Sequence, residues 1–509
     1  MARGNEVVKE VEWRIKVEED ETLQKTVVGC IWAVTAGVAL KLCKFVKKAW
    51  ELGVNDPRKF IHCLKVGIAL SAVSLFYYWK PLYDGVGGNA MWAVMTVVVV
   101  FEYTAGATIC KTVNRMFGTS LAGFLGIGVH WVASRAGEQW EPVIVGVSLF
   151  LLASAATFSR FIPTLKARFD YGILIFILTF SLVSVSGYRV DELLVMAQYR
   201  ICTIIIGSIL CIIISVIIRP IWAGFELFVL VTGNLDKLAN SLQCCVAQYF
   251  GGSEASEDSD EMSDKKLLGY KCVLSSKATE ETMANFARWE PAHGRFNFRH
   301  PWRQYVKIGA SMRSCASCLD ALIGCINSDN QASDDMKKNM SSISMKLGAN
   351  CASVIRELAT TIRKMAKSSK LDILVTDMNS AAQELRSLLN PYPNLVNAPS
   401  HNAKISTQTE TASPDDQAAK IEIPLMEIIQ VVTVASLLIE IVARVEGIVE
   451  NVEELSVLAN FQAEMCVKSK QHTSDSKVSP DQQNDDDPLD TPNGLRYTIY
   501  IYMRSTLHI

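Results

Sequence analysis

The sequence lacks the short motifs by which common enzyme classes are recognised. It contains no GxSxG, HExxH or Walker sequence, and its seven histidines are dispersed, with no cysteine at a usable spacing. It also lacks an excess of charge, because 50 Lys and Arg residues are balanced by 52 Asp and Glu residues. Nucleic-acid-binding domains are usually basic. We therefore expect neither an enzyme nor a nucleic-acid-binding protein, and no cofactor.

A disulfide framework is also missing, although the chain has 14 cysteines. The cysteines are scattered, and Cys110, Cys202 and Cys211 lie inside apolar runs, which favours reduced thiols. One CxxC motif, formed by Cys315 and Cys318, has no second pair of ligands at a spacing typical of zinc sites. Small residues packing in a helix are the better interpretation, and we expect no metal site.

Long apolar runs are abundant. Half of the residues are apolar, and residues 61–218 are almost continuously so, while charge is concentrated toward both ends. Six segments are close to the roughly 20 residues that a membrane-spanning helix needs: 61–79, 89–110, 116–134, 142–159, 171–188 and 201–218. A backbone in the bilayer core satisfies its polar groups within a helix. We predict an all-α membrane protein with six transmembrane helices in residues 61–220.

The orientation follows from the loops between these segments. One set of alternate loops, together with the segment before the first span, carries most of the basic residues: Lys41, Lys44, Lys47, Lys48, Arg58, Lys59, Lys111, Arg115, Arg160, Lys166 and Arg168. The other loops are mainly acidic. Because basic loops stay in the cytosol, both termini are predicted to be cytosolic.

Residues 1–60 are predicted to be a cytosolic N-terminal segment. The first twenty-odd residues lack the basic start and the apolar run of a secretory signal. The apolar run at 26–40 is shorter than a span, so we expect it to lie at the membrane interface or inside the protein.

After Pro220 the pattern becomes that of amphipathic helices, which predicts a cytosolic helical domain over 221–466. Its helices are expected at about 264–287, 302–327, 332–367, 370–389 and 421–466. The last is apolar enough to suggest a seventh span, but the charged residues inside it favour a core or dimer helix. The polar tail, 467–509, is predicted to be disordered. Ser413 and Ser479, each followed by proline, are possible phosphorylation sites.

Charged residues inside the apolar half are the candidate site. Lys111 and Arg115 lie four residues apart and bracket the short turn expected between the second and third spans, and Glu102 lies deeper in the second. A charge at membrane depth needs a partner or a water-filled cavity. Glu102 could pair with Lys65 or Lys111 while the other cations reach the headgroups. As a set, the excess of cations better fits a positive pore wall for anions, formed by Lys65, Glu102, Lys111, Arg115, Arg160 and Arg200.

Several long strings make the chain similar to a known family. These are DPRKFIHCLKVGIAL, YDGVGGNAMWAVMTVVVVFEYTAGAT, SRFIPTLKARFDYG, FSLVSVSGYR, the WEP of Trp289, Glu290 and Pro291, and VVTVASLLIEIVARVEGIVENVEEL. Together they resemble the plant aluminium-activated malate transporter family over about residues 40–465.

The resemblance implies an anion channel for malate and other anions, built as a homodimer with six spans per subunit. It also implies that Lys111, Arg115 and Arg160, and with them Lys65, line the pore, and that Trp289, Glu290 and Pro291 form a regulatory motif. The segment 222–228 reads WAGFELF where the family often reads WAGEDLH, a region linked to GABA inhibition in some members. The resemblance therefore does not carry that inhibition over to this chain.

We expect passive anion permeation, gated by the cytosolic helices, with membrane lipid as the surrounding partner and the plasma membrane favoured over the vacuolar membrane. A coupled carrier of organic acids would use the same cations as a substrate site. A membrane scaffold or sensor would have no need of inward cations.

Overall fold

The computed structural model describes residues 21–78, 90–137, 139–186, 190–251, 266–297, 299–328, 334–389 and 425–463. These residues are almost entirely helical, as predicted for an all-α protein. The only strands among them are the two-residue β1 (Ala366–Lys367) and β2 (Gln462–Ala463), which pair in parallel. Ser413 and Ser479 lie outside the described residues.

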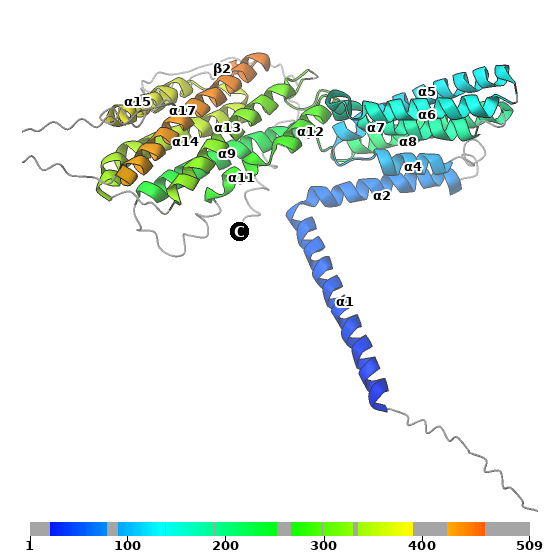
Figure 1. Cartoon of the computed structure of the whole chain (residues 1–509), viewed down its shortest axis with the longest axis horizontal. Helices are drawn as coiled ribbons and strands as arrows, with labels where there is room; N and C mark the ends of the chain where they lie inside the picture. Colours follow the sequence, from blue (N-terminus) through cyan, green and yellow to red (C-terminus); the bar gives the residue numbers. More distant parts are fainter. Residues whose placement is uncertain are drawn as a thin grey trace, which may run out of the picture. The chain divides into compact units, whose positions relative to one another are not determined.

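The helices of the apolar half are, in chain order, α1 (Glu21–Asn55), α2 (Pro57–Tyr78), α4 (Ala90–Val100), α5 (Ala105–Ala136), α6 (Glu141–Ser159), α7 (Pro163–Ser186) and α8 (Val190–Ile217) (Figure 1). Prolines mark three of the starts: Pro57 and Pro163 begin their helices, and Pro142 lies in the first turn of α6. Proline is favoured there because its missing N–H has no intrahelical partner.

Four of these helices, α2, α5, α6 and α7, are long and apolar enough to cross a membrane. Helix α4 has 11 residues, about 16 Å, and the apolar described part of α8 runs from Ile201 to Ile217. A hydrocarbon core is about 30 Å thick, so α4 alone is too short to span it. Six spans therefore remain a prediction.

The turn expected at 111–115 is wrong. The helix breaks earlier, at 101–104, and α5 then runs without interruption through Lys111 and Arg115. The side chain of Thr104 causes this start, because its hydroxyl accepts a hydrogen bond from the Ala107 N–H at 3.3 Å. No residue at 111–115 breaks a helix. Because apolar residues continue on both sides of the actual break, hydropathy alone did not indicate its position.

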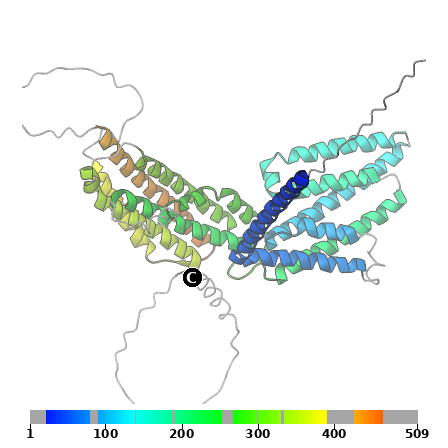
Figure 2. The same ribbon diagram turned by 90° about the horizontal axis from the view of Figure 1, so that it is seen from below.

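The membrane helices pack as two groups that meet where α5 contacts α8. Helices α2, α4 and α8 share an apolar core that includes Ala69, Val97 and Cys211. Helices α5 and α7 approach closely, since a Cβ at Gly118 would lie 2.5 Å from the Gly172 carbonyl oxygen. Figure 2 shows the same helices from a second direction.

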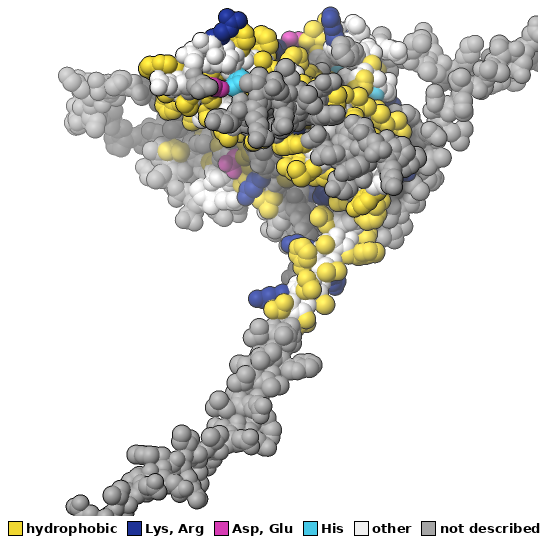
Figure 3. All heavy atoms as spheres, turned by 90° about the vertical axis from the view of Figure 1, so that its right-hand side faces the viewer, with side chains coloured by type: hydrophobic (Ala, Val, Ile, Leu, Met, Phe, Trp, Pro, Cys, Tyr) yellow, Lys and Arg dark blue, Asp and Glu magenta, His cyan; other side chains and the backbone are white. Residues whose placement is uncertain are grey.

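The second half of α1 is exposed. Its side chains from Val38 to Leu52 are exposed, and Figure 3 shows hydrophobic and basic side chains together on this part of the helix.

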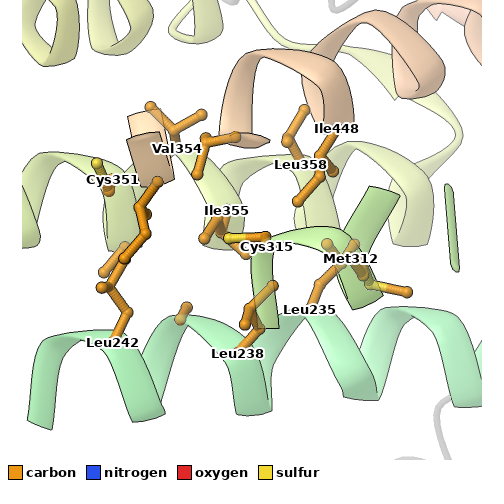
Figure 4. Packing of buried hydrophobic residues seen from close by; sticks show 14 of the residues in the cluster. Leu235, Leu238, Leu242, Met312, Cys315, Cys351, Val354, Ile355, Leu358 and Ile448 are labelled. Atoms are coloured by element: carbon orange, nitrogen blue, oxygen red, sulfur yellow. The ribbon is translucent and has the colours of Figure 1, made fainter. Parts of the chain in front are cut away.

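The second half of the chain is a helical bundle. Its helices are α9 (Ala223–Phe250), α11 (Gly269–Leu274), α12 (Lys277–Ala287), α13 (Trp302–Ile326), α14 (Asp334–Lys364), α15 (Leu371–Leu389) and α17 (Leu425–Leu458). Helices α9, α13, α14 and α17 enclose one apolar core (Figure 4). Each helix contributes side chains to it, for example Leu238 of α9, Met312 of α13, Ile355 of α14 and Ile448 of α17. Burial of apolar side chains on this scale is the main stabilising contribution to the bundle.

Two predictions are decided by this core. Helix α17 buries Val431, Leu438 and Val445 in the bundle, so it is a core helix and not a seventh span. Cys315 of the CxxC motif is also buried, which confirms the packing interpretation for that residue.

A charged pair lies inside the bundle between α12 and α13. The carboxylate of Glu280 is fully buried and accepts hydrogen bonds from Arg313 Nη1 at 2.5 Å and from Ser276 Oγ at 2.6 Å. Gly309 leaves room for this contact, because a Cβ there would lie 1.9 Å from Glu280 Oε2.

Candidate functional site

Lys111 and Glu102 form an ion pair near the N-terminal end of α5. This decides between the two partners that the sequence left open for Glu102. The Lys111 ammonium also lies 5.4 Å from the ring centroid of Tyr171 on α7, a cation–π contact. The Glu102 carboxylate therefore offsets the charge of Lys111.

Arg115 lies one helical turn further along α5 and is 7% exposed. Its Nη1 donates a hydrogen bond of 3.3 Å to Tyr171 Oη, while its Nε has no hydrogen-bond partner within the described residues. No described carboxylate forms an ion pair with this guanidinium. A buried cation without a counter-ion is costly unless water or an anion meets it.

A row of buried polar atoms continues from Arg115 along α5. Thr112, Arg115 and Thr119 are spaced three and four residues apart, so they share one face of the helix. The hydroxyls of Thr112 and Thr119 are buried and have no partner among the described residues. The same holds for Ser208 on α8, the helix that packs against α5. Such unpaired buried groups indicate places where water or a polar ligand binds.

The other basic residues of the predicted pore wall lie in different settings. Lys65 is 2% exposed and donates a 2.9 Å hydrogen bond to the Arg219 carbonyl oxygen. Arg160 forms a two-point pair with Asp170, at 2.7 and 3.3 Å. Arg200 belongs to α8, but its side chain lies outside the described residues. The structure thus brings Lys111 and Arg115 together around Tyr171 and places Lys65 and Arg160 in contacts of their own.

A second constellation centres on Glu290, whose side chain joins the first turns of α5 and α9. Its Oε1 accepts hydrogen bonds from the N–H groups of Gly106 at 3.2 Å and Ala223 at 2.6 Å. Its Oε2 accepts one from the Gly224 N–H at 3.1 Å. The first N–H groups of a helix have no intrahelical acceptor, and an anion is favourable there. One carboxylate therefore caps two helices, one from each half of the chain.

The segment between α8 and α9 is tied to the membrane helices by further contacts. Its backbone accepts hydrogen bonds at Arg219 from Lys65 and at Ile221 from the Ala105 N–H, the latter at 2.9 Å. Glu226, at the start of α9, forms an ion pair with Arg58 of α2. We call residues 219–226 together with Glu290 the joint. It connects α2, α5 and α8 to the helical bundle.

The three residues of the WEP motif have different environments. Trp289 is 36% exposed, whereas Glu290 is 3% exposed, and Pro291 follows the end of α12. Next to the motif, the ring of His293 stacks on that of Trp222, with the ring centroids 4.0 Å apart. Burial raises the pKa of Glu290 to about 7, while its three backbone N–H donors act to lower it.

Sequence reasoning missed Tyr171 and Gly106. Tyr171 follows Asp170 at the end of a stretch that the sequence presents as a basic loop, where a tyrosine gives no signal of its own; the structure places both residues in α7. Gly106 follows Thr104 in a run that otherwise reads as mid-span. A Cβ at Gly106 would lie 2.5 Å from the Phe286 carbonyl oxygen and 2.7 Å from Glu290 Oε1. Only glycine lets α12 come this close to α5.

The substitution Gly106→Ala is expected to weaken the joint, because backbone atoms of α12 cannot move aside as a flexible side chain can. We expect a loss of roughly 1–3 kcal/mol, the range for overpacked sites, measured as a lower melting temperature of the detergent-purified protein. Gly123→Ala on the same helix is the matched control, since a Cβ there meets nothing within 4 Å. Equal melting temperatures for the two variants would contradict the close contact at Gly106.

Comparison with known proteins gives consistent matches over most of the chain. A family model described as aluminium activated malate transporter matches residues 50–420 and 397–456. The chain is 50% identical over 491 residues to aluminum-activated malate transporter 10 of Arabidopsis thaliana, covering 92% of this chain and 97% of that protein. It is 42% identical over 451 residues to aluminum-activated malate transporter 2 of the same plant, covering 88% and 84%. It is 37% identical over 485 residues to aluminum-activated malate transporter 1 of Triticum aestivum, covering 93% and 97%.

Proposed function

The chain belongs to the aluminium-activated malate transporter family, and from this premise we propose that it is a channel that conducts malate and other anions passively across a plant membrane. At the level of the family, the activity is transport of malate or related anions by a multi-pass membrane protein. Passive conduction, gated by the cytosolic bundle, is the finer part of the proposal.

The observation that carries this proposal is the setting of Arg115. Its guanidinium is buried among apolar helices, and no described carboxylate neutralises it. The unpaired hydroxyls of Thr112 and Thr119 lie on the same face of α5, and α8, which packs against α5, carries another at Ser208. An anion crossing the membrane needs a positive potential and polar groups that replace part of its water shell, and these residues supply both.

Neutralising Arg115 tests this assignment directly. For Arg115→Gln we expect anion conductance to fall about tenfold at equal surface expression. A charge 4 Å from an anion is worth about 4 kcal/mol at an effective dielectric constant of 20, and a third of that energy suffices for a factor of ten. Whole-cell voltage clamp in malate and in chloride measures the change.

Arg135→Gln is the control for this experiment, because Arg135 is an exposed residue near the other end of the same helix. Its currents should equal those of the unmodified chain. Unchanged currents in Arg115→Gln, with the protein present at the cell surface, would remove Arg115 from the anion path.

A coupled carrier is the second candidate, and the break at 101–104 favours it. Carriers often bind their substrate where a membrane helix is interrupted. In this chain, however, the first N–H groups after the break are occupied by the Thr104 hydroxyl and Glu290 and are not open to a substrate. The reversal potential separates the two functions. A channel follows the anion gradient alone, whereas coupling shifts the potential with pH or sodium at fixed anion.

The remaining parts of the proposal concern assembly and placement. Helix α6 is apolar along its length, and none of its residues is buried by the described part of the chain, so it has a face available for lipid or for a second copy. We propose a homodimer with six spans per subunit and both termini in the cytosol, in the plasma membrane rather than the vacuolar membrane. Arg160 and Arg200 are retained as candidate pore residues, and phosphorylation at Ser413 or Ser479 as candidate regulation.

A further inference from the structure

The second half of α1 separates its side chains by chemistry around the helix axis. At 100° per residue, one arc of about 120° holds every charged or amide side chain between positions 38 and 55: Lys41, Lys44, Lys47, Lys48, Glu51 and Asn55. The rest of the circumference, about 240°, is apolar, with Leu40 the one apolar residue inside the polar arc. Four lysines and one glutamate make the polar face strongly positive.

No described part of the chain covers the apolar face. Within the described residues, five large apolar side chains of this face are 57–75% exposed: Val38, Leu42, Phe45, Val46 and Trp50. Figure 3 shows the hydrophobic side chains of this part of α1 uncovered, with lysine side chains on the same helix. Exposed apolar surface of this extent marks a place where another phase or partner binds.

The position of α1 in the chain identifies that partner. Helix α1 ends at Asn55 and α2, a candidate span, begins at Pro57, with only Asp56 between them. The Asp56 N–H still bonds to the Leu52 carbonyl oxygen, so the two helices meet without a flexible linker. Arg58 and Lys59 in the first turn of α2 are paired with acidic residues, Arg58 with Asp56 and Glu226 and Lys59 with Asp56, so among the described residues the unpaired lysines of this region lie on α1. The apolar face of α1 is therefore held where the inner membrane surface would be.

We propose that residues 38–55 of α1 form an interfacial helix that lies on the cytosolic leaflet and binds its anionic lipid headgroups. This inference rests on the proposed cytosolic N-terminus. The lysine face is complementary to an anionic surface, and the lysines at the edges of the arc can reach headgroups while their stems cover apolar surface. Phe45 and Trp50 supply the aromatic contacts that are typical of the interface.

A membrane explains this surface better than a protein groove. A helix that packs against a protein usually presents an apolar stripe of about 100°, and the apolar arc of α1 is about twice as wide. Acyl chains and headgroups surround a half-immersed helix on both flanks, and so cover such an arc completely. The charge asymmetry adds a second match, because cytosolic leaflets are negative.

Photo-crosslinking in the full-length protein tests the proposal without any use of transport activity. Benzoylphenylalanine is placed at position 45 on the apolar face or at the neighbouring position 44 on the lysine face, and each protein is reconstituted into vesicles of phosphatidylcholine with phosphatidylserine. We expect cross-links to lipid acyl chains at position 45, and at least about threefold fewer at position 44 because that position faces the aqueous side.

A second arm tests the charge. With position 45 labelled, replacing Lys41, Lys44, Lys47 and Lys48 by Gln should lower lipid cross-linking in the phosphatidylserine vesicles and leave it unchanged in phosphatidylcholine alone. Cross-links from position 45 to a second copy or to this chain would overturn the proposal, as would equal lipid cross-linking at both positions. Insensitivity to the lysines would also overturn it. Because the readout is chemical, a failure here is separate from a failure of the channel assignment.

Discussion

Replacing Glu290 by alanine is expected to lower the free energy of unfolding by about 3 kcal/mol or more, since three buried N–H donors lose their acceptor at about 1–3 kcal/mol each. Those donors are Gly106, Ala223 and Gly224. For a domain of this size the melting temperature should fall by about 6 °C or more. We expect anion currents to be lost as well, because α5 carries Lys111 and Arg115 less than three turns beyond the joint.

Glutamine at position 290 provides a graded comparison. Its oxygen can still accept from Gly106 and Ala223, as Glu290 Oε1 does, but its amide nitrogen would meet the Gly224 N–H donor to donor. We therefore expect Glu290→Gln to melt between the unmodified protein and Glu290→Ala. Glu281→Ala removes an exposed carboxylate from α12 and should have no effect. If Glu290→Ala and Glu281→Ala have the same melting temperature, Glu290 does not hold α5 and α9 together.

The second large effect is expected inside the bundle. Arg313→Met would leave the fully buried Glu280 carboxylate with the Ser276 hydroxyl as its hydrogen-bond donor among the described side chains and with no cation. Breaking a buried ion pair from one side costs about 3–5 kcal/mol, because the remaining charge is desolvated and uncompensated. The change should appear as a lower melting temperature and as poor recovery of folded protein.

Two variants keep this prediction specific. Combining Glu280→Gln with Arg313→Met removes both charges, so a large part of the lost stability should return. Arg444→Met breaks the exposed pair with Glu440, whose side chains are 48% and 47% accessible, and should change stability by about 0.5 kcal/mol or less. A double variant no more stable than Arg313→Met would mean that packing, and not the charge of Glu280, determines the loss.

Much of the fold follows from local pattern. Helix α13 was expected at 302–327 and occupies 302–326, because Pro301 precedes it and its apolar residues recur with helical spacing. The same reasoning failed at 101–104, where apolar residues continue on both sides of the break. There the deciding interaction is the Thr104 cap, which is a hydroxyl-to-backbone contact that hydropathy does not register.

The candidate site was predictable only in part. The pairing of Glu102 with Lys111 was one of two options that spacing allowed, and a residue count could not choose between them. The role of Glu290 could not be derived, because its partners lie 184, 67 and 66 residues away in the chain. A cap formed across such a separation depends on how helices pack, which periodicity within one helix does not specify.

The joint is built largely from main-chain atoms, and this has a consequence for how freely its sequence can drift. Almost any residue could make these main-chain hydrogen bonds, which use the carbonyls of Arg219 and Ile221 and the N–H groups of Ala223 and Gly224. Substitution at 223 should therefore preserve the contact if the side chain fits. Position 224 is the exception, because a Cβ there would lie 2.4 Å from the Trp302 ring. The side chains at 225, 227 and 228 take no part in these main-chain contacts, so these positions can change while the main-chain connection between the two halves of the chain is kept.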